Sequence, residues 1–233
     1  YDPKTFRLQQ LRTLRHEYEP NPAFPAFRSN LKDDQVLQQL IYTYDPVGNI
    51  TEIEDQAYEP AFFRNQKVEP KSAYTYDALY RLITASGREN AKNMGTASGF
   101  GPTPDAAAAQ FPILADPKAL RNYSQHYAYD AVGNFITMQH IAVAGSWTRH
   151  YETASDSNRL EKTWMNDDKA NAVTYTYDTH GNMLNFTNIP VAKQNRWDYR
   201  DMIQTLDLEG GGTAWYQYDS QKQRSRKVIV RNN

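Results

Sequence analysis

The chain contains no cysteine, and several classes of site and partner are excluded by what it lacks. With Cys 0 among 233 residues, neither a disulfide nor a thiolate metal site can form. No apolar stretch approaches the roughly 20 residues that span a bilayer, and no signal peptide is visible. The net charge is -1, so no field of one sign is available to attract nucleic acid or acidic lipid.

The chain is also poor in hydrophobic residues but rich in tyrosine. Hydrophobic residues make up 39% of the chain and the mean hydropathy is -0.81. Disordered chains share such values, but they are poor in aromatics, whereas this chain is 13% aromatic and has 17 tyrosines. This composition favours sheets with one apolar and one wet face, where tyrosine packs its ring and keeps its hydroxyl in water.

A Tyr-x-Tyr-Asp motif recurs five times along the chain, and a Gly-Asn pair completes three of the copies. A repeated unit of this kind sets the architecture and builds a surface or container more often than an active site. The motif residues are Tyr42, Tyr44, Asp45, Gly48 and Asn49; Tyr74, Tyr76 and Asp77; Tyr127, Tyr129, Asp130, Gly133 and Asn134; Tyr175, Tyr177, Asp178, Gly181 and Asn182; and Tyr216, Tyr218 and Asp219.

Each motif predicts a β-hairpin. Alternating tyrosines are typical of a strand, and Asp45-Pro46-Val47-Gly48 has the residues of a type I turn followed by a left-handed glycine. Such a three-residue loop with a bulge pairs the residue before the aspartate with the residue after the asparagine. The rule predicts four aromatic–apolar pairs: Tyr44 with Ile50, Tyr76 with Leu82, Tyr129 with Phe135, and Tyr177 with Met183.

Two copies depart from the full motif. The copies at Asp77 and Asp219 lack the glycine, and the last one would pair Tyr218 with Arg224. We expect the turn at Asp77 to be stabilised differently and the last copy to be degenerate or at the edge of the fragment.

The whole chain is predicted to be one all-β segment, residues 1–233. Half-units that have lost part of the motif follow Tyr1, Ser157 and Arg196, and the unequal intervals between copies argue against a propeller. We expect an array of antiparallel hairpins in a curved or spiralling sheet. A glycine- and proline-rich stretch, residues 86–125, is predicted to be a loop insertion with a short helix from Asp105, and residues 20–32 form a second loop. Both chain ends look like cuts through a longer protein.

Catalytic and metal-binding patterns are weak, and we predict no catalytic, cofactor or metal residues. His126, His140 and His150 converge only if their strands align, and no zinc-binding spacing is present. The carboxylate pairs Asp33-Asp34 and Asp167-Asp168 would point apart in a strand. No serine elbow or phosphate loop is found, and Gly210-Gly211-Gly212 is interpreted as a hairpin turn.

Two surface features leave binding open. The tryptophans Trp147, Trp164, Trp197 and Trp215 either face the inside of the sheet or stack on sugar rings. The basic run Lys222 to Lys227 is either a solvated strand face or a contact for an anionic partner.

The repeats resemble the YD repeats of RHS proteins, over nearly the whole chain. Within that family, the segments that begin at Tyr1, Tyr42, Phe62, Tyr74 and Ser157 look like the repeat section of the B component of bacterial insecticidal toxin complexes. The resemblance implies a sheet strip that winds into a hollow shell around a cytotoxic polypeptide passenger. The related teneurins use such a shell in cell adhesion. The family's self-cleaving Asp-Pro-x-Gly-Leu core motif does not occur in this chain.

The resemblance favours a structural, non-enzymatic shell segment of a secreted toxin complex. Its expected partners are other parts of the complex and the enclosed passenger, without nucleic acid, cofactor or membrane span. An adhesion or carbohydrate-binding module is the alternative, and an unrecognised hydrolase is the least favoured reading.

The turn chemistry predicts the outcome of one substitution. Gly48→Val should lower the free energy of unfolding by about 1 kcal/mol or more, because a β-branched residue resists positive φ. The same change at Gly145, outside any predicted turn, is expected to be near neutral in a denaturant titration. Equal losses at both positions would count against the turn.

Overall fold

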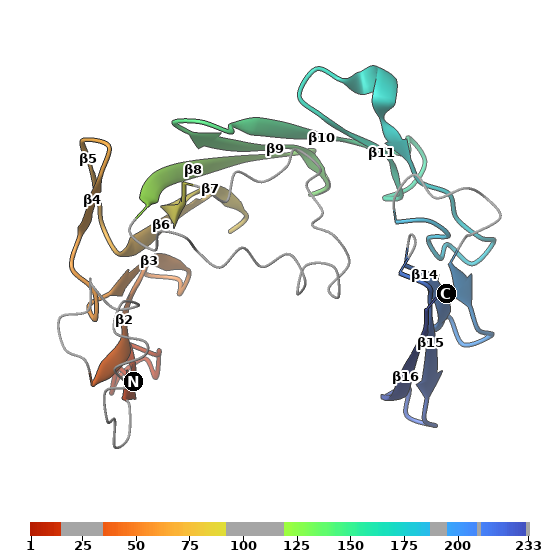
Figure 1. The fold of residues 1–233 in the computed structure, drawn as a ribbon, viewed down its shortest axis with the longest axis horizontal. Helices are drawn as coiled ribbons and strands as arrows, with labels where there is room; N and C mark the ends of the chain where they lie inside the picture. Colours follow the sequence, from red (N-terminus) through yellow and green to blue (C-terminus); the bar gives the residue numbers. More distant parts are fainter. Residues whose placement is uncertain (15–34, 92–118, 187–194, 209–210, 232–233) are drawn as a thin grey trace. The chain divides into compact units, whose positions relative to one another are not determined.

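Antiparallel hairpins make up nearly all of the described chain. The computed structural model describes residues 1–14, 35–91, 119–186, 195–208 and 211–231 (Figure 1). Its largest sheet has ten strands in the order β1-β2-β3-β6-β7-β8-β9-β10-β11-β12, which does not close on itself. The all-β antiparallel class predicted from the sequence is confirmed. Among the described residues the one helical element is a 3-10 turn, Lys169–Asn171.

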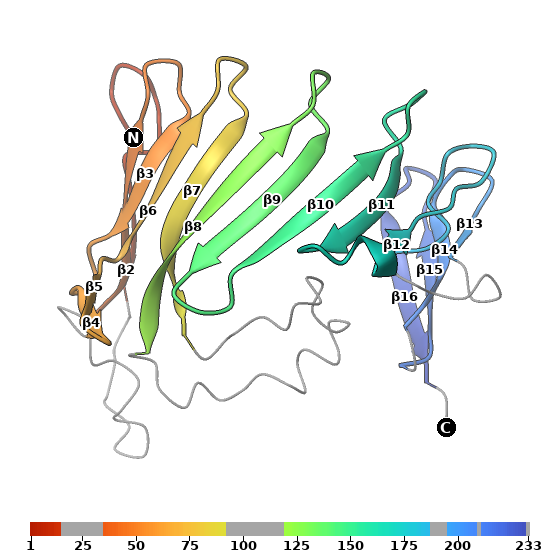
Figure 2. The ribbon, with the colours of Figure 1, turned by 90° about the horizontal axis from the view of Figure 1, so that it is seen from above.

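The strands of the large sheet are joined mostly by tight turns. Their bounds are β1 Gln10–Leu14, β2 Val36–Tyr44, β3 Ile50–Asp55, β6 Lys71–Tyr76, β7 Leu82–Asn90, β8 Leu120–Tyr129, β9 Phe135–Ala142, β10 Trp147–Thr153, β11 Leu160–Met165 and β12 Val173–Thr174. Figure 2 shows the turns that follow β2 and β6 at the same edge of the sheet.

Two smaller sheets complete the fold. One contains β13 Arg196–Trp197, β14 Ile203–Asp207, β15 Thr213–Tyr218 and β16 Arg224–Val230 in chain order. The other is a hairpin of β4 Ala61–Phe63 and β5 Gln66–Val68, tied to β8 by a hydrogen bond of 3.1 Å from Asn122 Nδ2 to the Lys67 carbonyl. The turn between β14 and β15 is closed from Leu208 to Gly212 and confirms the hairpin predicted at the glycine triplet.

The chain divides into two compact units. The first unit comprises β1 to β8 with most of β9, and the second comprises most of β10 with β11 to β16. Whether residues 1–233 act as one segment stays a prediction.

Four of the five predicted cross-strand pairs are confirmed. Tyr44 pairs with Ile50, Tyr76 with Leu82 and Tyr218 with Arg224, each beside a bulge. Tyr177 and Met183 form an isolated bridge. The remaining predicted pair is Tyr129 with Phe135. The turn between these two residues is closed by a hydrogen bond from Asp130 N to the Asn134 carbonyl at 2.9 Å.

Large buried side chains are few in the described residues. The buried apolar residues are mostly alanine, with Val36, Val68, Tyr175 and Leu208, and every residue of β3 is only half-buried. The ladder hydrogen bonds and cross-strand pairs therefore contribute more to this fold than a central core does.

The boundaries of the predicted insertion were wrong at both ends. Residues 86–90 belong to β7 and 120–125 to β8, where Ser86 pairs with Ser124 and Asn90 with Leu120. The pairing partners are far apart in sequence, so the local composition could not reveal them. The rest of that stretch, with the helix predicted from Asp105, and the loop 20–32 lie outside the described residues.

The structure also corrects the control for Gly48→Val. Gly48 has φ +111 as predicted, but Gly145 has φ +75, so valine is strained at both positions. A position in extended strand serves better: Thr43 lies exposed in β2. In a urea titration, Gly48→Val should lower the free energy of unfolding by about 1 kcal/mol or more, whereas Thr43→Val should leave it nearly unchanged. A similar loss for both variants would contradict the turn.

Candidate functional site: the Tyr-Asp turns

Each motif aspartate closes its turn with its own carboxylate. Asp45 Oδ1 accepts the backbone N–H of Gly48 at 2.7 Å and of Asn49 at 2.8 Å. Its Oδ2 accepts from the Asn49 side-chain amide at 2.7 Å. The two carboxylate oxygens thus accept from three N–H donors that have no partner on the neighbouring strand. These bonds hold the loop at one length.

The same carboxylate clamp recurs at other copies. Asp130 accepts from the backbone of Val132, Gly133 and Asn134 and from the Asn134 side chain. The hydrogen bond from that side chain is the main cause that lowers the pKa of Asp130, assisted by the backbone N–H groups and opposed by desolvation. A bond from the side chain of Asn182 likewise lowers the pKa of Asp178. These aspartates therefore stay ionised acceptors.

The copies without glycine use other residues in the left-handed position. Tyr80 has φ +62 in the turn after Asp77, and Lys222 has φ +62 in the turn after Asp219. At Asp77 the second oxygen accepts Nε of Arg81 at 2.7 Å, in place of the asparagine amide. A charge-assisted bond thus replaces the neutral one, which is how this turn is stabilised differently.

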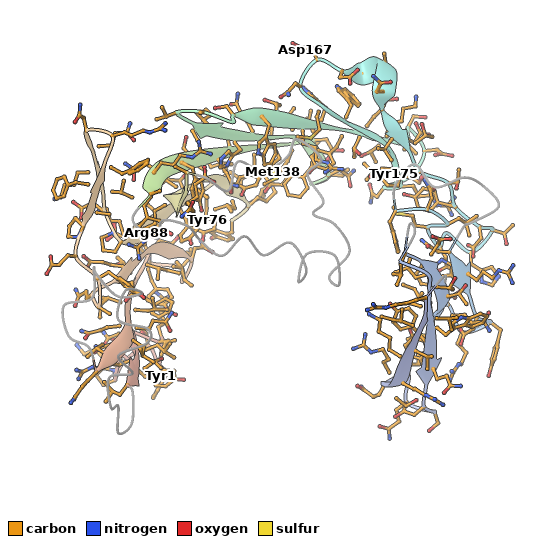
Figure 3. The ribbon with its side chains drawn as sticks, in the orientation of Figure 1. Tyr1, Tyr76, Arg88, Met138, Asp167 and Tyr175 are labelled. Carbon is orange, nitrogen blue, oxygen red and sulfur yellow. The ribbon has the colours of Figure 1, made fainter. Side chains whose placement is uncertain are left out.

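In four of the five copies, the second tyrosine of the motif bonds its hairpin to the hairpin before it. Tyr76 (labelled in Figure 3) donates its hydroxyl to the Ile50 carbonyl at 2.8 Å, and Ile50 is the residue that follows the previous turn. The equivalent bonds are Tyr44 to Leu8 at 2.7 Å, Tyr129 to Leu82 at 2.8 Å and Tyr177 to Leu160 at 2.7 Å. This bond was not predicted from the sequence, because its acceptor is a backbone atom on another hairpin.

An arginine from the preceding hairpin covers the ring of the same tyrosine. Guanidinium carbons lie 4.9–5.6 Å from the ring centroids in three such pairs, Arg7 over Tyr44, Arg81 over Tyr129 and Arg159 over Tyr177. Each arginine directly precedes the leucine whose carbonyl accepts the hydroxyl of the tyrosine that the arginine covers. The Arg-Leu dipeptides in the sequence were the available signal.

The first tyrosines of the motif have no shared partner. Tyr175 (Figure 3) is buried, and its hydroxyl lies 3.1 Å from Thr163 Oγ1. Tyr127 donates to Gln125 Oε1 at 2.6 Å, and Tyr216 lies 6.0 Å from the charged groups of both Arg224 and Lys227. Their contribution is packing on one face of the sheet.

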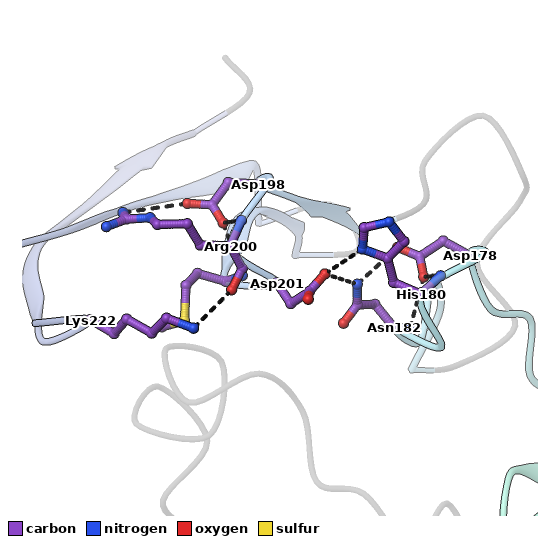
Figure 4. Close-up of polar contacts among 8 residues, drawn as sticks. Asp178, His180, Asn182, Asp198, Arg200, Asp201 and Lys222 are labelled. Carbon is purple, nitrogen blue, oxygen red and sulfur yellow. Dashed lines mark hydrogen bonds and ion pairs between the residues drawn. The ribbon is translucent and has the colours of Figure 1, made fainter. Parts of the chain in front are cut away.

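In the second unit, neighbouring turns contact each other directly (Figure 4). Asp201 Oδ1 lies 2.9 Å from His180 Nδ1 and accepts the Asn182 side-chain amide at 2.8 Å. On the other side Arg200 donates to the Asp219 carbonyl at 3.0 Å, and Lys222 donates to the Arg200 carbonyl. The turns of this unit therefore form a continuous polar row.

The first unit holds a separate polar cluster around Glu89. Its Oε1 accepts Nε of Arg121 at 2.7 Å and lies 3.2 Å from Nε2 of His140. Both partners are buried, and the His140 ring stacks on Tyr123 and Trp147. Glu89 thus compensates a buried guanidinium, which makes the cluster structural in kind.

The candidate metal and acid–base residues do not form a site in the described part of the chain. No group of three or more His, Asp or Glu residues able to hold a metal ion is found there. His150 stacks on Trp164. In the pair Asp167-Asp168, both carboxylate oxygens of Asp168 accept from the Asn171 side-chain amide. Asp33-Asp34 and the glycines 95–101 lie outside the described residues. Within the described residues, no helix is long and apolar enough to cross a membrane.

Comparisons with known proteins point to one family. The chain is 32% identical to toxin subunit YenC1 of Yersinia entomophaga over 242 residues, which cover 100% of this chain and 22% of that protein. Toxin subunit YenC2 of the same organism is 32% identical over 235 residues, covering 98% of this chain and again 22% of the relative. The chain therefore spans about a fifth of the length of these relatives.

Solved structures agree over the same span. A crystal structure of TcdB2-TccC3 without the hypervariable C-terminal region matches with a TM-score of 0.69 and 29% identity, over 100% of this chain and 10% of that chain. The Photorhabdus luminescens Tc holotoxin pore matches with a TM-score of 0.67 and 30% identity, over 98% of this chain and 10% of that chain. No family model matches the chain.

The chain is an RHS-repeat protein related to toxin-complex subunits. The turn motif, the registers and the similarity to YenC1 over the whole of this chain agree on this point. Its assignment to the B component in particular stays a prediction, since the curated relatives are YenC1 and YenC2.

The tyrosine ties of the RHS repeat predict a selective loss. Tyr76→Phe should lower the free energy of unfolding by about 1 kcal/mol, because the Ile50 carbonyl loses its hydroxyl partner. Tyr74→Phe is the matched control, since no hydrogen bond from the Tyr74 hydroxyl to another described residue is found. Urea titrations measure both, and a loss no larger for Tyr76→Phe than for Tyr74→Phe would contradict the tie.

The contact between turns in the second unit predicts a shifted pKa for His180. The hydrogen bond that the His180 ring donates to Asp201, followed by the charges of Asp201 and Asp178, raises the pKa of His180 above its ordinary value. Because the pKa of His180 is higher in the folded state, this contact contributes stability at pH values below the unfolded-state pKa. That stabilisation is lost as the pH rises through the folded-state pKa. NMR titration of the His180 ring should show the shift, and Asp201→Asn should reduce it. An unchanged His180 pKa in that variant would refute the pair.

Proposed function

We propose that this chain is a wall segment of an RHS-repeat shell that encloses a polypeptide passenger in a toxin complex. The observation that carries the proposal is the repeated tie between hairpins, in which the second motif tyrosine of four copies bonds to the backbone of the preceding hairpin. Each new hairpin adds the same contacts, so a sheet can be extended without a new core. The similarity to YenC1 over the whole chain supports it.

The residue chemistry of the repeats suits a structural role. The motif aspartates accept hydrogen bonds within their own turns, and Asp45 does so with both carboxylate oxygens. Burial raises the pKa of Tyr76, Tyr129 and Tyr177, which keeps these hydroxyls protonated donors. Neither group is left to act on a substrate. The segment works without catalysis of its own.

The proposed partners follow from this role. Other parts of the toxin complex continue the wall, and the cytotoxic passenger lies against it. The complex acts outside the producing cell, so the segment is extracellular. Adhesion or carbohydrate binding is the second candidate, favoured by one observation: Trp215 is 48% exposed.

Protection of the passenger tests the shell. The full-length protein with its passenger is treated with trypsin, and cleavage of the passenger is followed by mass spectrometry. We expect slow cleavage in the wild type and faster cleavage when Asp45→Ala and Asp130→Ala open two turns of the wall. Thr43→Val is the control and should protect like the wild type. Passenger cleavage as fast in the intact protein as for free passenger would contradict enclosure.

A further inference from the structure

Trp215 differs from the three other tryptophans because, among the described residues, no partner is found for its ring or its Nε1. Trp147 stacks on His140, and Trp164 lies between His150 and the Lys169 ammonium. Trp197 donates Nε1 to the Met183 carbonyl at 2.9 Å. Three of the tryptophans are thus committed to the fold, whereas Trp215 is 48% exposed.

A hollow lies beside Trp215 on the four-stranded sheet of the second unit. It measures about 420 Å³, within the range of small-ligand sites. The ladder places Trp215 opposite Val228 and Gln217 opposite Arg226, so these four side chains share one face. The lining residues are Gln204, Trp215, Tyr216, Gln217, Arg226, Val228 and Val230.

Polar side chains at this hollow lack partners in the described part of the chain. No side-chain hydrogen bond or ion pair is found there for Gln204, Gln217 or Arg226. An aromatic surface with several free planar hydrogen-bonding groups around it is a ligand-site pattern, because such groups orient a bound molecule against an apolar surface.

The charge around the hollow favours an anion. Residues 220–231 contain Lys222, Arg224, Arg226, Lys227 and Arg231 but no Asp or Glu. Arg224 and Lys227 lie over Tyr216, the neighbour of Trp215 on the strand, so Arg226 is the cation of β16 that lines the hollow. No acidic residue lines it.

We propose that this hollow binds an acidic saccharide, with Trp215 under the apolar face of a carboxylate-bearing pyranose ring. The Arg226 guanidinium pairs with the sugar carboxylate, and the Gln217 amide on the same face bonds to a ring hydroxyl. A sugar acid is favoured over an acidic peptide because it offers a carboxylate to Arg226 and also a hydroxyl to the Gln217 amide, while an acidic side chain offers only a carboxylate. This site does not depend on the shell function.

Tryptophan fluorescence of the full chain tests the proposal, with an oligosaccharide of glucuronic acid as the probe. The emission should change on titration, and the change should disappear in Trp215→Ala. Arg226→Gln should weaken binding by about tenfold or more, because a charge-assisted bond is lost. A glucose oligosaccharide of the same length should bind at least about tenfold more weakly.

Matched variants and competitors separate this site from general attraction of anions. Arg224→Gln removes the same charge beside Tyr216 and should change the affinity by less than about twofold. Circular dichroism verifies that each variant is folded. Equal losses for Arg224→Gln and Arg226→Gln, or equally tight binding of poly-glutamate or a DNA oligonucleotide, would overturn the saccharide site. Absence of any emission change at millimolar probe would overturn it too. Loss of this site would leave passenger protection untouched, so the two proposals fail separately.

Discussion

The carboxylate clamp of the motif aspartate is the interaction on which the rest of the structure depends. One oxygen of Asp45 holds the backbone of the turn, and the other holds the side chain four residues on. This bonding fixes the loop at one length, and loop length fixes register. A slip of one residue would move every strand side chain to the opposite face, so the clamp determines which side chains meet across the whole hairpin.

Correct register is what brings the tyrosine to its neighbour. With Tyr44 opposite Ile50, the next hairpin's Tyr76 reaches the Ile50 carbonyl, and an arginine covers the equivalent ring in other copies. The described sheets bury few large side chains, so these contacts between hairpins supply stability that a packed core supplies in other folds. A fold stabilised from hairpin to hairpin can be lengthened by repetition, and this property suits the wall of a container. The surface of such a wall remains free for other contacts, as the hollow beside Trp215 illustrates.

Local features of this fold could be predicted from the sequence, and distant ones could not. The turn at Gly48 and the pair Tyr177–Met183 follow from residues within one hairpin, and both were predicted. The tie from Tyr129 to Leu82 joins residues that are far apart in the chain, and its acceptor is a backbone atom that no residue type marks. The Glu89 cluster and the polar strand ends at 86–90 depend on long-range pairing in the same way. Gly145 was misjudged because its left-handed turn carries no Tyr-Asp signature.

Native-state hydrogen exchange on the wild type and on Asp45→Ala tests the central role of the clamp most directly. In the wild type the amide N–H groups of Gly48 and Asn49 should exchange as slowly as the ladder amides of the same hairpin, because the Asp45 carboxylate holds them. In Asp45→Ala these two amides should lose protection, and the ladder between Tyr44 and Ile50 should lose it with them. Unchanged protection of that ladder in the variant would contradict the account.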